Sequence, residues 1–322
     1  MKKLISFFVL VFLAVAMTAC NDEANENAAS KKQKAVQSVQ VFSVDNADGK
    51  ITAQSISEAF NSVGLTVGAN NDMNKPFSQR FPKLHYKVYR LAVFYNQELS
   101  YKLIKKQPSF GLLTPLTMSI WSDGKTINLA TLTLEGLARA SELSVEDEDL
   151  VAYSKLIEKA LQKALPGGAF QELDYTVKFP DKSLATYFQT EVELDEDGDI
   201  ESYKEDFQDE MESELGALGF LFPNFIDVKE ALLTPNGNEE YDFYDTYSFC
   251  KFDVIYPVSK LHPEAGAYAP CSFYMYKRKD ENIMKMGFLS VENWVSTLDM
   301  EDKESLEPLR AAQSTIEQVI NE

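Results

Sequence analysis

An internal repeat constrains the fold of this chain more than any other feature of its sequence. The segment Ile56–Val67 matches the segment Met211–Phe222, which lies 155 residues later. Each segment has the pattern of an amphipathic helix that ends at a glycine, Gly64 or Gly219, before an apolar strand. Glycine accepts the positive φ that a helix C-cap requires. The pattern therefore predicts two similar folding units.

A second pair of segments keeps the same offset. Leu113–Trp121 aligns with Tyr268–Tyr276, and each contains a proline followed by an alternating strand. In both halves a turn, another strand and a helix start that contains a glutamate come next. Chance coincidence is the alternative, because strands of period two resemble one another.

The predicted elements have the same order in both halves: a strand, a helix, three or four strands and a closing helix. The expected strands are Val39–Val44, Leu65–Ala69, Val88–Tyr95, Leu116–Ser122 and Thr126–Leu132, then Ala185–Leu194, Phe220–Ile226, Tyr247–Tyr256, Cys271–Tyr276 and Ile283–Leu289. The expected helices are Ala53–Val63, Leu134–Ser141 and Glu146–Ala164, then Glu201–Leu218 and Ser305–Ile320. Strands in runs with flanking helices predict an α+β fold, in which each domain is an antiparallel sheet with helices on one face. Because Pro166, Gly167 and Gly168 mark a boundary, we expect domains at residues 37–165 and 170–322.

The two halves also share an apolar strand, a loop, and a proline followed by an alternating strand. These segments are Leu91–Tyr95 with Leu112–Trp121, and Phe252–Pro257 with Pro270–Tyr276. They resemble the bacterial family catalogued as domain of unknown function 302, as two copies. The resemblance implies helices on one face of a curved antiparallel sheet. It implies no activity, because none is agreed for that family.

The first residues have the pattern of a bacterial lipoprotein leader. Lys2 and Lys3 precede the apolar run Leu4–Ala16, which predicts a secretory signal peptide over residues 1–19. Cys20 at the cut site makes the segment resemble a lipobox, which implies acylation of the Cys20 thiol. An ordinary signal peptide with an incidental cysteine is the alternative. The polar residues 20–36 are expected to be a flexible tether behind the lipid.

The charge and the cysteine content limit which binding partners and which cysteine pairing we expect. A net charge of −19 repels both nucleic acid and anionic lipid, so the membrane is an expected partner only through the N-terminal lipid. Because Asn21 rather than Asp follows Cys20, we expect the outer membrane of a Gram-negative bacterium, facing the periplasm. Cys250 and Cys271 are then the remaining cysteines, and an oxidising compartment favours a disulfide between them. Two unpaired core cysteines are the alternative.

An acidic run before the second long helix suggests a metal site. Glu193, Asp195, Asp197 and Asp199 alternate with other residues, as in a calcium-binding loop. Lys204 stands where that loop needs a bidentate glutamate. The expected structure is a strand-to-helix turn with acids near a helix N-terminus, and weak calcium binding is the alternative.

An aromatic stretch is the candidate ligand or partner face. Tyr241, Phe243 and Tyr247 are its central residues. The alternative is a strand with one face in the core. No nucleophile, phosphate loop or dinucleotide fingerprint stands out, so we expect no cofactor and no enzymatic activity. The expected function is binding of a small molecule or an envelope protein, with a structural or assembly role in the envelope as the alternative.

The leader pattern gives the first prediction. Replacing Cys20→Ser removes the thiol that would take the lipid, so the protein should become soluble or remain uncleaved. Membrane fractionation and intact mass measure this. Unchanged fractionation with no mass shift would contradict lipidation at Cys20.

Overall fold

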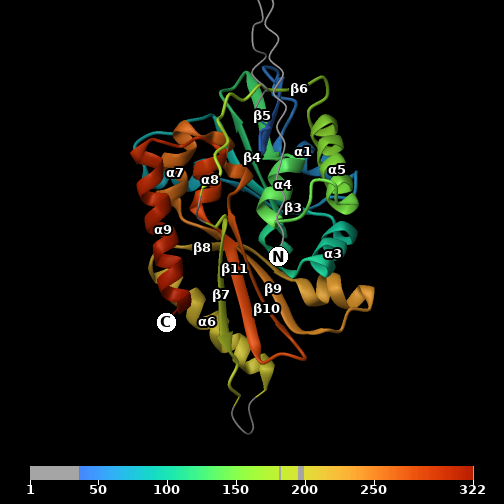
Figure 1. Cartoon of the computed structure of the whole chain (residues 1–322). Coiled ribbons are helices and arrows are strands. Elements are labelled where there is room, and N and C mark those ends of the chain that lie inside the picture. Colours follow the sequence, from blue (N-terminus) through green and yellow to red (C-terminus); the bar gives the residue numbers. More distant parts are fainter. Residues whose placement is uncertain (1–35, 181–182, 195–198, 322) are drawn as a thin grey trace, which may run out of the picture. The chain divides into compact units, whose positions relative to one another are not determined.

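Two antiparallel sheets form the frame of the protein in this computed structural model, which describes residues 36–180, 183–194 and 199–321 (Figure 1). Sheet A contains, in spatial order, β2 (Thr66–Asp72), β3 (Val88–Tyr95), β4 (Leu116–Ser122), β5 (Thr126–Leu132), β1 (Val39–Asp45) and β6 (Ala169–Phe170). Sheet B contains β7 (Ala185–Glu191), β11 (Ile283–Leu289), β10 (Cys271–Arg278), β9 (Tyr241–Cys250) and β8 (Leu221–Asp227). Apart from the short β6, the order β2-β3-β4-β5-β1 matches the order β8-β9-β10-β11-β7. The two halves therefore have one topology, as a duplication requires.

The helices repeat in the same way. The first half has α1 (Ala53–Asn61), α2 (Asn74–Arg80), α3 (Gln97–Lys106), the 3₁₀ helix η1 (Pro108–Leu113), α4 (Leu134–Ser141) and α5 (Glu148–Ala164). The second half has α6 (Ile200–Ala217), the short turns η2 (Lys229–Leu233) and η3 (Thr234–Asn236), α7 (Phe252–Leu261), the 3₁₀ helix η4 (Pro263–Ala267), α8 (Val291–Thr297) and α9 (Lys303–Asn321). Strands β2 and β8, helices α3 and α7, and helices η1 and η4 all begin 155 residues apart. The predicted α+β fold is confirmed.

Side chains alternate between the two faces of each strand, so sheet B has two buried faces. On one face, strands β9 to β11 pack against helices α6 and α9 through Met211, Phe243, Phe273, Met286 and Ile316, among others. On the other face, Tyr244 and Tyr274 belong to a hydrophobic cluster that continues into the first half of the chain. Each half therefore completes its core with residues of the other.

The two halves exchange equivalent contacts through their 3₁₀ helices. Helix η1 packs on β10, and helix η4 packs on β4. A Cβ added at Gly111 of η1 would overlap Tyr274, and one added at Gly266 of η4 would overlap Ser119. Gly111 and Gly266 are equivalent positions, as are Ser119 and Tyr274. The contact therefore has approximate twofold symmetry within one chain.

Two further hydrogen bonds accompany this exchange. Thr117 Oγ1 on β4 donates to the carbonyl of Ala267 at 2.7 Å. Its equivalent on β10, Ser272 Oγ, donates to the carbonyl of Pro115 at 2.9 Å. Both hydroxyls are buried, so each hydrogen bond satisfies groups that would otherwise be costly in the core.

The predicted strand Tyr247–Tyr256 is wrong in its second part. Strand β9 ends at Cys250, and helix α7 begins at Phe252. Val254, Ile255 and Val258 are buried at helical spacing, and a short apolar run fits either period. The segment Phe252–Pro257 is consequently equivalent to the start of α3 rather than to Leu91–Tyr95.

Helix ends follow the sequence in part. Gly64 and Gly219 have φ values of 95° and 87°, as expected for helix C-terminal glycines. Thr52 and Ser55 form the capping box of α1. Among the described residues, no helix is both long and apolar enough to cross a membrane.

The exchange of 3₁₀ helices gives the second prediction. Gly266→Ala places a methyl group against Ser119, so overpacking should lower the free energy of unfolding by about 1–3 kcal/mol. Gly216→Ala is the control, because a Cβ at that helical position meets nothing within 4 Å and should be neutral or stabilising. Urea denaturation of the purified protein measures both. Equal effects of the two substitutions would contradict a tight contact at Gly266.

Candidate functional site

The aromatic candidates Tyr241, Phe243 and Tyr247 are buried in the structure. Each is at most 3% exposed. Tyr241 belongs to the cluster shared by the two halves, whereas Phe243 and Tyr247 belong to the cluster beneath α6 and α9. They lie on β9 as core residues and line no open surface.

Two of the four acidic candidates lie within the described residues. Asp195 and Asp197 lie outside the described residues, and Glu193 is exposed. Asp199 is the N-cap of α6, where its Oδ1 accepts the backbone N–H of Ser202 at 2.8 Å. This is the helix-start role that the acidic run predicted. Within the described part of the chain, no group of three or more His, Cys, Asp and Glu side chains could hold a metal ion.

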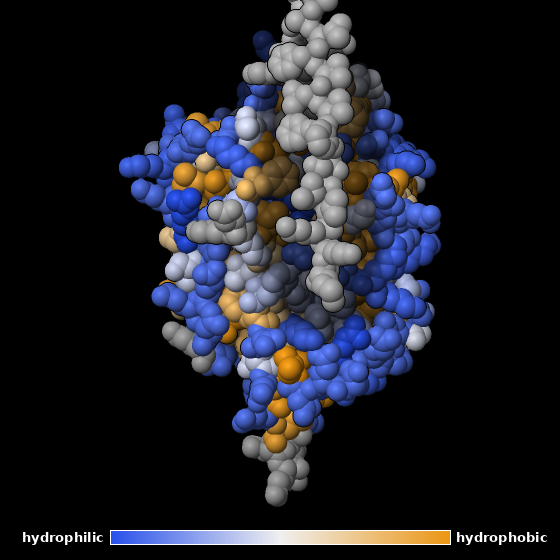
Figure 2. Space-filling model, in the orientation of Figure 1, coloured by the Kyte–Doolittle hydropathy of each residue, from blue (hydrophilic) through white to orange (hydrophobic). Residues whose placement is uncertain are grey.

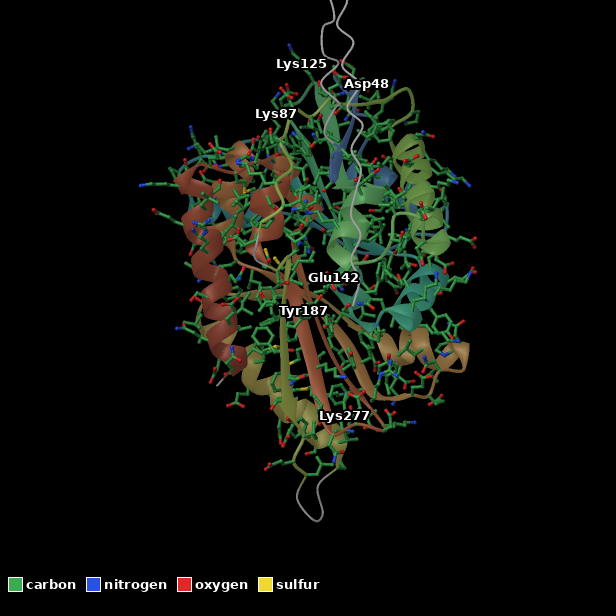
Figure 3. The ribbon with its side chains drawn as sticks, viewed as in Figure 1. Asp48, Lys87, Lys125, Glu142, Tyr187 and Lys277 are labelled. Carbon is green, nitrogen blue, oxygen red and sulfur yellow. The ribbon has the colours of Figure 1, made fainter. Side chains whose placement is uncertain are left out.

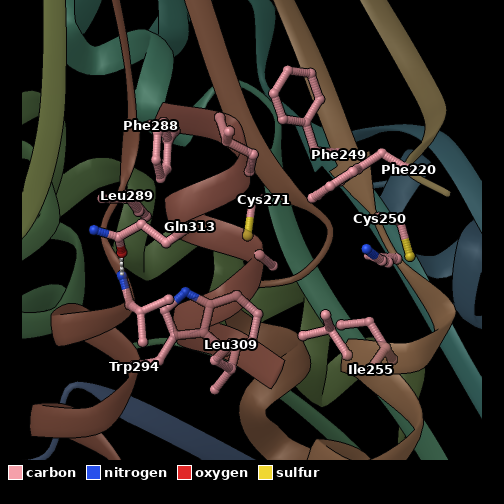
Figure 4. A pocket seen from close by; sticks show the side chains of 15 residues that line it. Phe220, Phe249, Cys250, Ile255, Cys271, Phe288, Leu289, Trp294, Leu309 and Gln313 are labelled. Carbon is pink, nitrogen blue, oxygen red and sulfur yellow. Dashed lines mark hydrogen bonds between the residues drawn. The ribbon is translucent and has the colours of Figure 1, made fainter. Parts of the chain in front are cut away.

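The two candidate disulfide partners are free thiols here. Cys271 is paired with Phe249 across the sheet, so Cys250 is not its direct cross-strand partner, although both cysteines pack against the same hydrophobic cluster. Figure 4 shows the two sulfurs as separate atoms in the wall of a cavity of about 40 Å³. Burial raises the pKa of both thiols to about 12, which keeps them protonated and poorly nucleophilic. The disulfide stays a prediction, and Cys20 lies outside the described residues.

A larger hollow lies between the two halves. Strands β2 and β8 are edge strands of sheets A and B, and they approach each other beside a groove of about 550 Å³. Leu91 and Val93 of β3 form one apolar wall, Leu221 and Phe222 of β8 form another, and Phe252 lies at the start of α7. Figure 2 shows one face of the molecule, on which hydrophilic residues surround separate apolar patches.

Polar groups line other parts of the groove. The Asp72 carboxylate lies 3.8 Å from Arg90 and accepts the backbone N–H of Asn74 at 3.0 Å. Lys75 has no ion pair among the described residues, and the buried Nδ2 of Asn224 has no hydrogen-bond partner there. A buried donor without a partner is costly, so a ligand acceptor beside Asn224 would relieve that cost. The groove thus combines apolar walls with a few polar groups, of which the Asn224 amide nitrogen has no partner among the described residues.

Little in the sequence indicates this groove. Its walls come from segments around residues 69–76, 91–93, 221–224 and 250–252, which the fold brings together. The one available signal was the equivalence of β2 and β8, which places both at the edge of a sheet.

A buried carboxyl group lies outside the groove, beneath α6. Asp245 on β9 is 1% exposed, and burial raises its pKa from 3.8 to about 7. Gln208 Nε2 donates to Asp245 Oδ2 at 3.0 Å, and Lys204 Nζ lies 4.0 Å from the same oxygen. Lys204 favours the ionised form but does not outweigh burial.

This carboxyl group gives the third prediction. Because its pKa is higher in the folded than in the unfolded protein, Asp245 favours folding below about pH 4, and that contribution is lost as the pH rises through about 7. Asp245→Asn removes the titration. Relative to the wild type, the variant should gain roughly 2–3 kcal/mol of stability between about pH 5 and pH 8. Urea denaturation at both pH values measures this, and a pH-independent difference between the two proteins would contradict it.

Comparison with known proteins places the chain in a family. No curated protein matches it. Three chains of solved structures match, and one is an uncharacterized conserved protein DUF302 from Bacillus stearothermophilus. That structure has 15% identity and a TM-score of 0.34, and the match covers 42% of this chain and 95% of that one. The family model for Domain of unknown function DUF302 matches residues 41–165 and 200–322, which is more than half of the chain. The protein therefore belongs to the DUF302 family and carries two copies of its domain.

Proposed function

We propose that this protein is a non-enzymatic binding protein of the bacterial envelope, which takes a small, mainly apolar molecule into the groove between its two halves. The observation that carries the proposal is the groove itself. Its volume of about 550 Å³ lies within the usual range for small-molecule sites, and its walls are largely apolar. The unpartnered Asn224 amide supplies a polar contact that would orient a ligand.

The envelope location rests on the leader. Basic residues and an apolar run form a signal-peptide pattern, Cys20 at its cut site resembles a lipobox, and residues 20–36 would tether the folded part to the lipid. The net charge of −19 then keeps the folded part away from anionic lipid. In this arrangement the groove remains open to the periplasm.

A structural role in the envelope is the second candidate, and one observation favours it. The exchange of η1 and η4 makes the two halves an intramolecular counterpart of a twofold dimer. Such a unit is stable without a ligand and is suited to presenting a fixed surface to another protein. The groove experiment below separates the two candidates.

The fourth prediction tests the groove with Nile red, a neutral apolar dye. Leu221 lines the groove and is 40% exposed, so Leu221→Lys places a charge against its apolar wall. We expect this change to weaken dye binding by about tenfold, which corresponds to about 1.4 kcal/mol. Fluorescence titration of the purified protein measures the affinity.

Leu218→Lys is the matched control. Leu218 lies three residues earlier, is 48% exposed and is not part of the groove wall. The control should change the affinity by less than about twofold. Equal weakening by both substitutions, or no saturable dye binding to the wild type, would refute the groove as an apolar site and leave the structural role.

A further inference from the structure

The two halves differ most in how their first helices begin. Helices α1 and α6 end within one residue of equivalent positions, shortly before Gly64 and Gly219, which are 155 residues apart. By the same offset, the first residue of α1, Ala53, is equivalent to Gln208. Helix α6 therefore has an additional segment, Ile200–Phe207, which α1 lacks.

In the second half, α6 covers one end of sheet B. Asp245 and Met275 are paired across β9 and β10. Gln208 donates to Asp245 at 3.0 Å, and its Nε2 lies 4.0 Å from the sulfur of Met275. The side chain of Gln208 therefore lies over this pair and closes the end of the sheet.

In the first half, the same end of the sheet is open. Arg90 and Ile120 are the pair equivalent to Asp245 and Met275. Ala53 stands in the place of Gln208, and its methyl group cannot contact Arg90 in the way that the Gln208 amide contacts Asp245, so the Arg90 side chain stays 21% exposed. A cleft of about 420 Å³ occupies this place, with Val88, Ile120 and Ile127 among its lining residues.

The charged residues that line the cleft are both cations, Lys87 and Arg90. Arg90 is held by Asn70, with Nε donating to Oδ1 at 2.8 Å, and by Asp72 at 3.8 Å. Lys87 lies against Gly124 and has no ion pair among the described residues. Figure 3 shows Lys87 and Lys125 at the same end of the molecule, with Asp48, whose carboxylate pairs with Lys50 at 2.7 Å.

We propose that this cleft is a second binding site, which takes a small organic anion with an apolar body. Its acidic group lies at Lys87 and Arg90, where charge-assisted hydrogen bonds are available. Its apolar part lies against the apolar part of the lining, where Val88 is partly exposed and Ile120 and Ile127 lie behind it as buried residues. The site is separate from the groove between the halves, so either can exist without the other.

Hexanoate is the test probe, because it joins a carboxylate to a short apolar chain. Calorimetric titration of the full chain with hexanoate should show one saturable site. Hexylamine, of the same length but opposite charge, and inorganic phosphate, which lacks the apolar part, should each bind at least about tenfold more weakly. Equal binding of hexanoate and phosphate would overturn the proposed ligand class.

Ala53→Gln tests the place of the site by reproducing the second half, where glutamine closes the sheet. We expect it to weaken hexanoate binding by about tenfold. Ala152→Gln on the exposed side of α5 is the matched control and should have less than about a twofold effect. Unchanged binding in Ala53→Gln would overturn the assignment.

Lys87→Gln tests the anion contact without altering a helix. It should weaken hexanoate binding several-fold, whereas Lys105→Gln, an exposed lysine on α3, should not. Equal effects of the two lysine changes would show that net charge alone attracts the anion and would refute the contact. Failure of hexanoate to bind, with Nile red binding retained, overturns the second site and leaves the groove intact.

Discussion

The reciprocal contact of the two 3₁₀ helices is the constraint on which the rest of the structure depends. Each helix lies on a strand of the opposite sheet, and Gly111 and Gly266 allow the backbones to approach that closely. Because interiors are packed to near-crystalline density, a side chain at either glycine would separate the sheets. The inner face of each sheet is buried only when the other half is present, so the two domains share one core. The position of β2 against β8, and with it the groove, follows from this contact.

Much of the fold could be predicted because the repeat added information to local patterns. Strands β3, β4, β5 and β11 match their predicted bounds, since period-two alternation and nearby turns agree there. Helix α7 could not be distinguished from a strand in the sequence, because its apolar run is short. The correct assignment of that run depends on where β9 ends. Helix α3 has clear end signals in its sequence: Asn96 caps its start, and Lys105 and Lys106 lie in its last turn. The 155-residue offset would have linked α3 to α7 and corrected both.

The sites were less predictable for a physical reason. Aromatic density at Tyr241, Phe243 and Tyr247 indicates burial as readily as binding, and here the two faces of β9 are both covered. The groove and the cleft instead lie where part of a sheet is not covered by a neighbouring segment. An uncovered sheet edge or a shortened helix leaves no residue signature of its own. The role of Ala53 becomes clear only when it is compared with its equivalent, Gln208. That comparison requires the strand register of both sheets.

The difference between the two halves also explains why one sheet position holds opposite charges. Asp245 lies under the long α6, which brings Lys204 and Gln208 to its carboxyl group. Arg90, at the equivalent position, has no such helix above it and is held by Asn70 and Asp72 of the neighbouring strand. Each of these side chains finds its polar partners within its own half, on α6 for Asp245 and on β2 for Arg90. An arginine beneath α6 would face Lys204, and an aspartate in place of Arg90 would face Asp72 without a cation. The two halves therefore differ both in the length of this helix and in the charged residue beneath it: sheet A has a cation-lined cleft there, whereas Gln208 covers the same end of sheet B.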